Sequence, residues 1–162
     1  MKLIFKQRFF SWFDSYDIYD ENGDVYFTVK GQLSWGHTFK IYDKNNQEIG
    51  MLKQRLFTFL PKYEIYINNR LLGEIHKEFT FFKPKFNITF NNYTVDGDFF
   101  DWDYDVYRDG IKVSSINKEI FKLTDTYTIT TSEEEALISL MIVLAIDSIK
   151  DQRNNNNKKR AN

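Results

Sequence analysis

The apolar segment ALISLMIVLAI, residues 136–146, lies near the C-terminal end of the chain and largely determines its architecture. It follows Ser132-Glu133-Glu134-Glu135, whose first and fourth residues have the spacing of a helix N-terminal capping box. A helix that is apolar on every side must be buried in protein or in lipid. A membrane-spanning helix needs about 20 apolar residues, whereas Asp147 ends this run. The sequence therefore predicts a buried helix over about 133–151 and no transmembrane span.

Upstream of this helix, a two-part motif occurs six times. The first part consists of three residues at alternate positions, of which the first and third are apolar and the middle one varies. The second part is an aromatic residue followed two positions later by Ile or Val. This period of two is typical of β-strands, because successive side chains point to opposite faces of a sheet. Each repeat therefore predicts a hairpin of two strands. The first parts are Phe5-Gln7-Phe9, Val29-Gly31-Leu33, Leu52-Gln54-Leu56, Ile75-Lys77-Phe79, Val95-Gly97-Phe99 and Ile116-Lys118-Ile120, and the second parts are Tyr16-Ile18, Phe39-Ile41, Tyr63-Ile65, Phe86-Ile88, Tyr104-Val106 and Tyr127-Ile129.

The repeats and the helix together predict one barrel. About eight strands make a barrel that its own side chains can fill, so twelve strands leave space that a central helix would occupy. The predicted fold is mainly β, a closed twelve-stranded antiparallel barrel of six hairpin repeats that encloses one hydrophobic C-terminal α-helix. Residues 1–151 form this domain. The Asn/Lys-rich segment 152–162 is predicted to be disordered because of its polar, low-complexity composition.

Composition narrows the possible functions. The 162 residues include 22 basic and 23 acidic side chains, and this balance gives no overall attraction to nucleic acid, so no dedicated nucleic-acid site is expected. The absence of cysteine excludes disulfides, thiolate zinc sites and cysteine nucleophiles. Neither a nucleophile elbow nor a phosphate-binding glycine loop is present. We therefore expect no enzymatic activity and no cofactor. The charged N-terminal segment lacks the apolar core of a signal peptide, which indicates a cytoplasmic location.

Two sets of side chains raise the question of a metal site. His37 and His76 lie in different repeats without a ligand residue at metal-binding spacing, so we expect both to be solvated. The five aspartates of residues 96–105 could hold a cation such as Ca²⁺ or form a charged outer face that discourages edge pairing. Their spacing differs from that of an EF-hand loop, which favours the charged face, and no metal site is assigned.

Three segments resemble the LURP-one-related family: KQRFFSW at residues 6–12, FTFFKPKF at residues 79–86 and SLMIVLAID at residues 139–147. That family belongs to the tubby C-terminal-like superfamily, to which the phospholipid scramblases are distantly similar. The resemblance covers Met1 to about Ile149, and it implies a twelve-stranded barrel around a hydrophobic C-terminal helix. It implies no enzymatic activity. Tubby proteins bind phosphoinositides through basic surface residues, and the resemblance does not extend to a residue-by-residue match of that site.

The family resemblance and the outward basic residues give the first functional hypothesis. Lys53 and Arg55 alternate with inward residues of the third repeat, and Lys83 and Lys85 flank a proline beside aromatic residues in the turn of the fourth. Basic residues next to exposed aromatic residues suit a lipid headgroup and its acyl border. We therefore predict a non-catalytic domain that recognises an anionic phospholipid headgroup at the cytoplasmic surface of a membrane. These four residues are its candidate site.

The second hypothesis is a protein-interaction or structural domain without a small-molecule ligand. Aromatic residues are frequent in interaction hot spots. The predicted turns contain Trp12-Phe13, Trp35 and Trp102, which would form the contact surface for an unknown protein partner.

Overall fold

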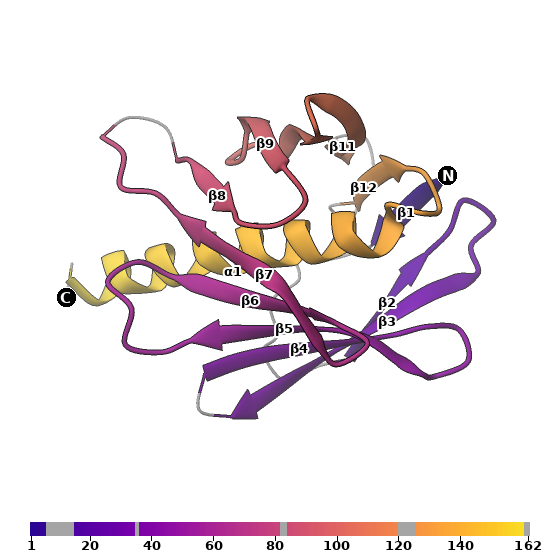
Figure 1. Cartoon of the computed structure of the whole chain (residues 1–162), viewed down its shortest axis with the longest axis horizontal. Helices are drawn as coiled ribbons and strands as arrows, with labels where there is room; N and C mark the ends of the chain where they lie inside the picture. Colours follow the sequence, from indigo (N-terminus) through magenta and orange to yellow (C-terminus); the bar gives the residue numbers. More distant parts are fainter. Residues whose placement is uncertain (6–14, 35, 82–83, 120–125, 161–162) are drawn as a thin grey trace.

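The computed structural model describes residues 1–5, 15–34, 36–81, 84–119 and 126–160, without the side chains of residues 33, 34, 119 and 151–160. This part of the chain forms twelve strands and one helix (Figure 1). The strands are β1 (Lys2–Phe5), β2 (Ser15–Tyr19), β3 (Val25–Ser34), β4 (Gly36–Tyr42), β5 (Glu48–Arg55), β6 (Lys62–Ile67), β7 (Arg70–Lys77), β8 (Phe86–Ile88), β9 (Tyr93–Asp98), β10 (Asp103–Arg108), β11 (Ile111–Glu119) and β12 (Thr126–Thr131), and the helix is α1 (Ala136–Arg160).

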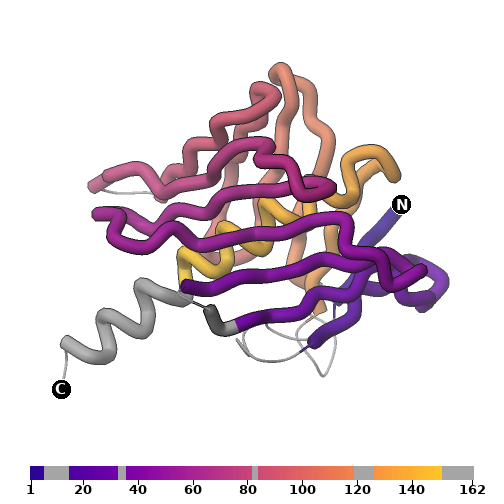
Figure 2. The backbone as a smooth tube through the Cα atoms, turned by 60° about the horizontal axis from the view of Figure 1, so that its bottom comes forward, coloured from indigo at the N-terminus to yellow at the C-terminus, as the bar shows by residue number. Residues whose placement is uncertain are grey.

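The strands form one antiparallel sheet in the order β8-β7-β6-β5-β4-β3-β2-β1-β12-β11-β10-β9. The two strands of every predicted repeat pair with each other, from β1 with β2 to β11 with β12. β1 also pairs with β12, so the first and last repeats meet and the sheet curls around α1 (Figure 2). The prediction of a mainly β barrel of six hairpins around one C-terminal helix is confirmed.

The barrel is nearly closed, because no ladder joins β8 to β9 in the described part of the chain. β8 has only three residues and therefore offers few backbone groups for a second ladder. Side chains cover the seam instead, since the rings of Phe86 and Phe99 meet nearly edge to face with their centroids 4.9 Å apart. This seam is the one described place where the strands depart from the closed ring that the repeats predicted.

The apolar run of α1 fills the barrel. Residues 140–146 are each at most 1 % exposed, and the Ile or Val that ends each repeat packs into the same core. Full burial of one such side chain stabilises a fold by about 1.5–3 kcal/mol, so α1 is a main source of stability. The one polar side chain in the run, Ser139, has its hydroxyl 2.5 Å from the hydroxyl of Ser114 on β11.

The ends of α1 differ from the prediction of 133–151 followed by disorder. Residues 133–135 form a turn, and the Glu135 N–H donates to the Ser132 hydroxyl at 3.4 Å, as the capping box predicts. The helical backbone then continues through residues 152–160 to Arg160. An established helix gains a hydrogen bond with each added residue, and Lys, Arg and Gln are good helix formers. The domain boundary at residue 151 stays a prediction.

No helix in the described ranges combines the length and the apolar character that crossing a bilayer requires. The apolar part of α1 ends at Ile149, after which the sequence of the helix is polar and charged.

Polar contacts fasten α1 at both ends of the barrel. At its start, the buried carboxylate of Glu135 accepts a hydrogen bond from the Tyr93 hydroxyl at 2.5 Å and pairs with Arg108 at 2.5 Å. Burial, together with this hydrogen bond, raises the pKa of Tyr93. Further along the helix, the Lys150 ammonium donates to the Phe99 carbonyl and lies 4.7 Å from the centroid of the Trp102 ring.

The course of α1 defines two ends of the barrel. The helix-start end holds residues 133–135 and the turns between repeats, such as residues 20–24 and 43–47. The helix-exit end is where α1 leaves the barrel, on the left of Figure 1, and it holds the loops within repeats. This distinction positions the candidate site, because the charged and apolar side chains of the two ends differ.

Candidate functional site

Two neighbouring loops at the helix-exit end form the candidate site. They are the β5–β6 loop, residues 56–61, and the described part of the β7–β8 loop, residues 78–81 and 84–85. The loops adjoin because β6 pairs with β7. The Lys77 N–H donates to the Pro61 carbonyl at 3.4 Å, and the Glu78 N–H donates to the Lys85 carbonyl at 2.9 Å, which closes the base of the second loop. Both loops therefore contribute to one surface.

Four phenylalanine side chains project from these loops into solvent, and we refer to them as the phenylalanine rim. Phe57 is 98 % exposed, Phe59 94 %, Phe81 87 % and Phe79 68 %. The rings of Phe79 and Phe81 meet edge to face, with their centroids 5.4 Å apart. Scattered exposed apolar residues are normal in proteins, whereas clustered ones mark interaction sites. The rim is therefore the surface of the described chain that most needs a functional explanation.

Three of the four predicted lipid-binding residues lie beside the rim. Lys53 and Arg55 are exposed on β5, which leads into residues 56–61, and Lys85 is exposed just before β8. Lys83 lies outside the described residues. Neither Lys53 nor Lys85 forms an ion pair with another described residue. These two ammonium groups are thus available to an anionic ligand.

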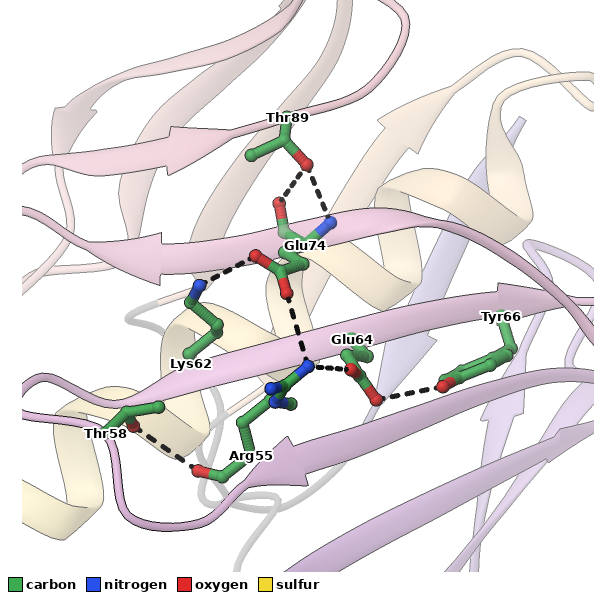
Figure 3. A network of polar contacts seen from close by, with 7 residues as sticks. All are labelled: Arg55, Thr58, Lys62, Glu64, Tyr66, Glu74 and Thr89. Atoms are coloured by element: carbon green, nitrogen blue, oxygen red, sulfur yellow. Dashed lines mark hydrogen bonds and ion pairs between the residues drawn. The ribbon is translucent and has the colours of Figure 1, made fainter.

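Arg55 differs, because it belongs to a network of charges on the outer face of β5, β6 and β7 (Figure 3). Its Nη1 donates to Oε1 of Glu64 at 2.9 Å, and the Tyr66 hydroxyl donates to Oε2 of the same carboxylate at 2.9 Å. Glu74 pairs with Lys62 at 2.8 Å and lies 4.0 Å from Arg55. Two cations and two carboxylates cancel, so this network holds neighbouring strands together and adds no net charge.

The network also sets the ionisation of Glu64. Burial, the largest single influence, acts to raise the pKa of Glu64, but hydrogen bonds from Arg55 and Tyr66 and the positive charges of Arg55 and Lys53 outweigh it, and the pKa is lowered. The hydrogen bond to Glu64 raises the pKa of Arg55 and that of Tyr66. Glu64 therefore stays ionised at neutral pH and keeps Arg55 in place.

The two rim loops and the turns of the helix-start end carry charges of opposite sign. By sequence, residues 53–62 and 77–85 carry six basic residues and one acidic residue, and after Glu64 and Glu74 cancel two of the cations a net charge of +3 is left. The turns of the helix-start end and the residues directly beside them carry nine acidic and three basic residues, and after Lys40 cancels Glu48 a net charge of −5 is left. The acidic residues are Asp20, Glu21, Asp24, Asp43, Glu48, Asp109, Glu133, Glu134 and Glu135, and the basic residues are Lys44, Arg70 and Arg108. Such a distribution orients a protein on a charged surface.

The acidic run of residues 96–105 lies on β9, β10 and the turn between them, across the seam from β8. Asp98 accepts hydrogen bonds from the N–H groups of Phe100 and Asp101 at 2.9 and 3.2 Å. Asp105 accepts one from the Ser115 hydroxyl at 2.6 Å. These carboxylates stabilise their own turn and ladder.

The two histidines lie apart, His37 on β4 and His76 on β7, and both are half-buried where we expected them to be solvated. Burial lowers the pKa of His37. Within the described ranges, no group of three or more histidine or carboxylate side chains is placed to hold a metal ion.

Of the aromatic residues named in the protein-interaction hypothesis, Trp102 lies in the described part of the chain, and it is buried. Trp102 is 7 % exposed, and its ring packs 4.4 Å from that of Tyr127, centroid to centroid. Trp12, Phe13 and Trp35 lie outside the described residues. Trp102 is thus a core residue.

Phe57 and Phe59 were not among the predicted site residues. The periodicity predicted Leu56 as an inward strand residue, but β5 ends at Arg55, and Leu56 is 38 % exposed in the loop. The signal that could have found the site is LFTFLP, residues 56–61, an apolar segment at a position where turns are normally polar.

A family model described as LURP-one-related matches residues 1–147. The chain belongs to the LURP-one-related family. This LURP-one-related chain is 32 % identical over 152 residues to the uncharacterised protein YxjI of Bacillus subtilis (strain 168), with 92 % of the chain and 93 % of YxjI covered. It is also similar to an Arabidopsis thaliana protein of known X-ray structure, with a TM-score of 0.60, 15 % identity and 91 % of each chain covered. Identity this low shows a shared fold alone.

Family membership confirms the resemblance seen in the sequence. The match extends from β1 into the buried part of α1 and therefore includes both loops of the candidate site. The rim and the charges beside it are therefore the features of this family member that bear on its function.

Proposed function

We propose that this LURP-one-related domain is a non-catalytic module that binds anionic phospholipid headgroups with its helix-exit end. The observation that carries the proposal is the contrast in charge between the two rim loops and the turns at the opposite end. The rim loops and the strand ends beside them carry a net charge of +3, and the helix-start turns carry a net charge of −5. An anionic membrane would attract the rim loops and repel those turns.

Lys53 and Lys85 are the leading headgroup contacts. Each basic residue near an anionic membrane surface contributes about 1 kcal/mol of attraction, and these two are exposed without an ion-pair partner among the described residues. Arg55 contributes less, because Glu64 and Glu74 already compensate its charge. Binding of this kind is peripheral, weakens as salt is added, and belongs at a cytoplasmic membrane surface, where anionic lipids are concentrated.

The proposal is tested by flotation with two kinds of vesicle, phosphatidylcholine alone and phosphatidylcholine mixed with phosphatidylglycerol. We expect the protein to float with the mixed vesicles at low salt and to stay in solution with the zwitterionic ones. The double variant Lys53→Gln/Lys85→Gln should lower the affinity about 25-fold, from about 1 kcal/mol for each cation. The matched control is Lys44→Gln/Arg70→Gln, which removes two exposed cations from the helix-start end and should change nothing.

Two results would contradict the proposal. One is that the wild-type protein stays in solution with the mixed vesicles at low salt. The other is that both double variants lose affinity equally, which would mean that net charge alone, and no particular surface, determines binding. Either result would favour the alternative function, a protein-interaction domain whose contact surface includes the same exposed loops.

A further inference from the structure

Resting on this proposed function, we infer that Phe57, Phe59, Phe79 and Phe81 form an insertion site, which enters the acyl border of an anionic bilayer while the neighbouring lysines contact its headgroups. The inference starts from a cluster of apolar side chains that the fold leaves unused. All four rings are between 68 and 98 % exposed, so none of them contributes fully to the core. They come from two loops whose bases share a hydrogen bond.

The backbone of Phe57 supplies a second, independent observation. Its φ of 59° lies in the left-handed region, which is unfavourable for a bulky residue. The described part of the chain has seven other non-glycine residues with a positive φ. Six of them are asparagine or aspartate, whose side chains tolerate the left-handed conformation. The remaining one, Trp102, is buried against Tyr127. Phe57 is 98 % exposed, so no packing compensates for its strain. Strain that folding does not explain is typical of functional positions.

The shape and charge of the surface favour a bilayer over a folded partner. The side chains stand out from two neighbouring loops, and a protein partner would need pockets matched to the rings of both. A fluid bilayer adapts to such protrusions, and interfacial segments enter it by about 5–10 Å. The exposed Lys53 and Lys85 border the loops at the level of the barrel, where headgroups would lie once the rings have entered.

The experiment measures partition of the full chain onto vesicles with equal amounts of phosphatidylcholine and phosphatidylglycerol. The variants are Phe57→Asn/Phe59→Ser and Phe79→Ser/Phe81→Ser. The matched control is Leu71→Ser/Ile111→Ser, which removes two apolar side chains, 56 and 70 % exposed, from the helix-start end. We expect about a tenfold loss of partition for each phenylalanine removed, from about 1.5 kcal/mol of burial, and no loss in the control. Circular dichroism verifies that every variant is folded.

Salt separates this inference from the proposed function. The loss caused by the phenylalanine variants should persist at high salt, because apolar burial is not screened, whereas the loss caused by Lys53→Gln/Lys85→Gln should vanish. If the wild type binds the vesicles and the phenylalanine variants bind equally well, the insertion site is wrong and the headgroup proposal stands. If the wild type does not bind at all, both are wrong. If the variants abolish self-association seen by size-exclusion chromatography and leave vesicle binding unchanged, the rim contacts a second copy of the chain, and the inference is overturned.

Discussion

The turns at the two ends of the barrel place different residues in left-handed backbone conformations. Turns at both ends require left-handed conformations. Glycine occupies some of these positions at both ends, but the other residues have short polar side chains at the helix-start end and are Phe57 and Trp102 at the helix-exit end. The residues at the helix-start end are Asn46, Asn68, Asn69, Asn91, Asn92 and Asp109. The residues at the helix-start end thus follow the known preferences of turns. The exposed Phe57 at the helix-exit end does not, which indicates that folding alone does not account for a phenylalanine at this position.

Hydrogen bonding distinguishes the helix-start turns from the two rim loops. At the helix-start end, Asp20 and Asp43 each accept hydrogen bonds from two backbone N–H groups of their own turn, at 2.8–3.0 Å. At the helix-exit end, the described side chains of residues 56–61 make one such contact, from the Thr58 hydroxyl to the Arg55 carbonyl at 3.4 Å. The helix-start turns are stabilised by their own side chains, whereas the rim loops present theirs to the surroundings.

Both ends depend on α1, and removal of its central packing should have the largest effect. We expect Leu140→Ala to lower the free energy of unfolding by about 3–5 kcal/mol, because Leu140 is fully buried and its truncation leaves a cavity. Urea unfolding followed by circular dichroism measures this change. Ile138→Ala, at a half-buried position on the same helix, should cost clearly less. Equal costs at the two positions would mean that the helix does not fill the barrel.

The next largest effect is expected at the helix-start end alone. Glu135→Ala removes the partner of the Arg108 guanidinium and of the buried Tyr93 hydroxyl, so the free energy of unfolding should fall by about 2–3 kcal/mol. Thermal unfolding measures it. The control is Glu134→Ala, whose carboxylate is 80 % exposed and 3.7 Å from Arg108, and it should change stability by less than about 0.5 kcal/mol. A similar loss in both variants would contradict the anchoring role of Glu135.

Acid should act on the network beside the rim. The pKa of Glu64 is lowered in the folded chain, so its contribution is present above the unfolded pKa of about 4.3 and is lost as pH falls through the folded value. As pH falls below about 5, wild-type stability should therefore decrease by about 1 kcal/mol more than that of Glu64→Gln. Urea unfolding at each pH measures the difference. If the stability of the two proteins changes with pH in the same way, the ionised Glu64 does not stabilise the fold.

The smallest expected effect comes from backbone strain. Exchanging phenylalanine and asparagine at left-handed positions should change the free energy of unfolding in opposite directions at the two ends. Phe57→Asn should raise the free energy of unfolding by about 0.5–1 kcal/mol, because asparagine tolerates the left-handed conformation and little packing is lost. The reciprocal change at the helix-start end, Asn69→Phe, should lower it by about 1 kcal/mol. Differential scanning calorimetry compares the two. A loss of stability in Phe57→Asn would show that Phe57 serves the fold.

The sequence predicted features that depend on local pattern. Tyr16-Ile18 and its five counterparts locate strands because their period of two does not depend on distant contacts. Ser132 and Glu135 place the start of α1 for the same reason. The pairing of Arg55 with Glu64 was not predicted, because it joins two strands and depends on their register. The exposure of Leu56 was not predicted, because an apolar residue in phase with Leu52 has the same pattern whether the strand continues or ends at Arg55.

The most direct test of the account compares the two ends of the barrel in one assay. The chain has no cysteine, so Phe59→Cys at the helix-exit end and Leu71→Cys at the helix-start end each give a single site for an environment-sensitive fluorophore. With vesicles of phosphatidylcholine and phosphatidylglycerol, we expect a blue-shifted, brighter emission at position 59 and an unchanged spectrum at position 71. An unchanged spectrum at position 59 while the protein is bound, or the same shift at both positions, would contradict this expectation.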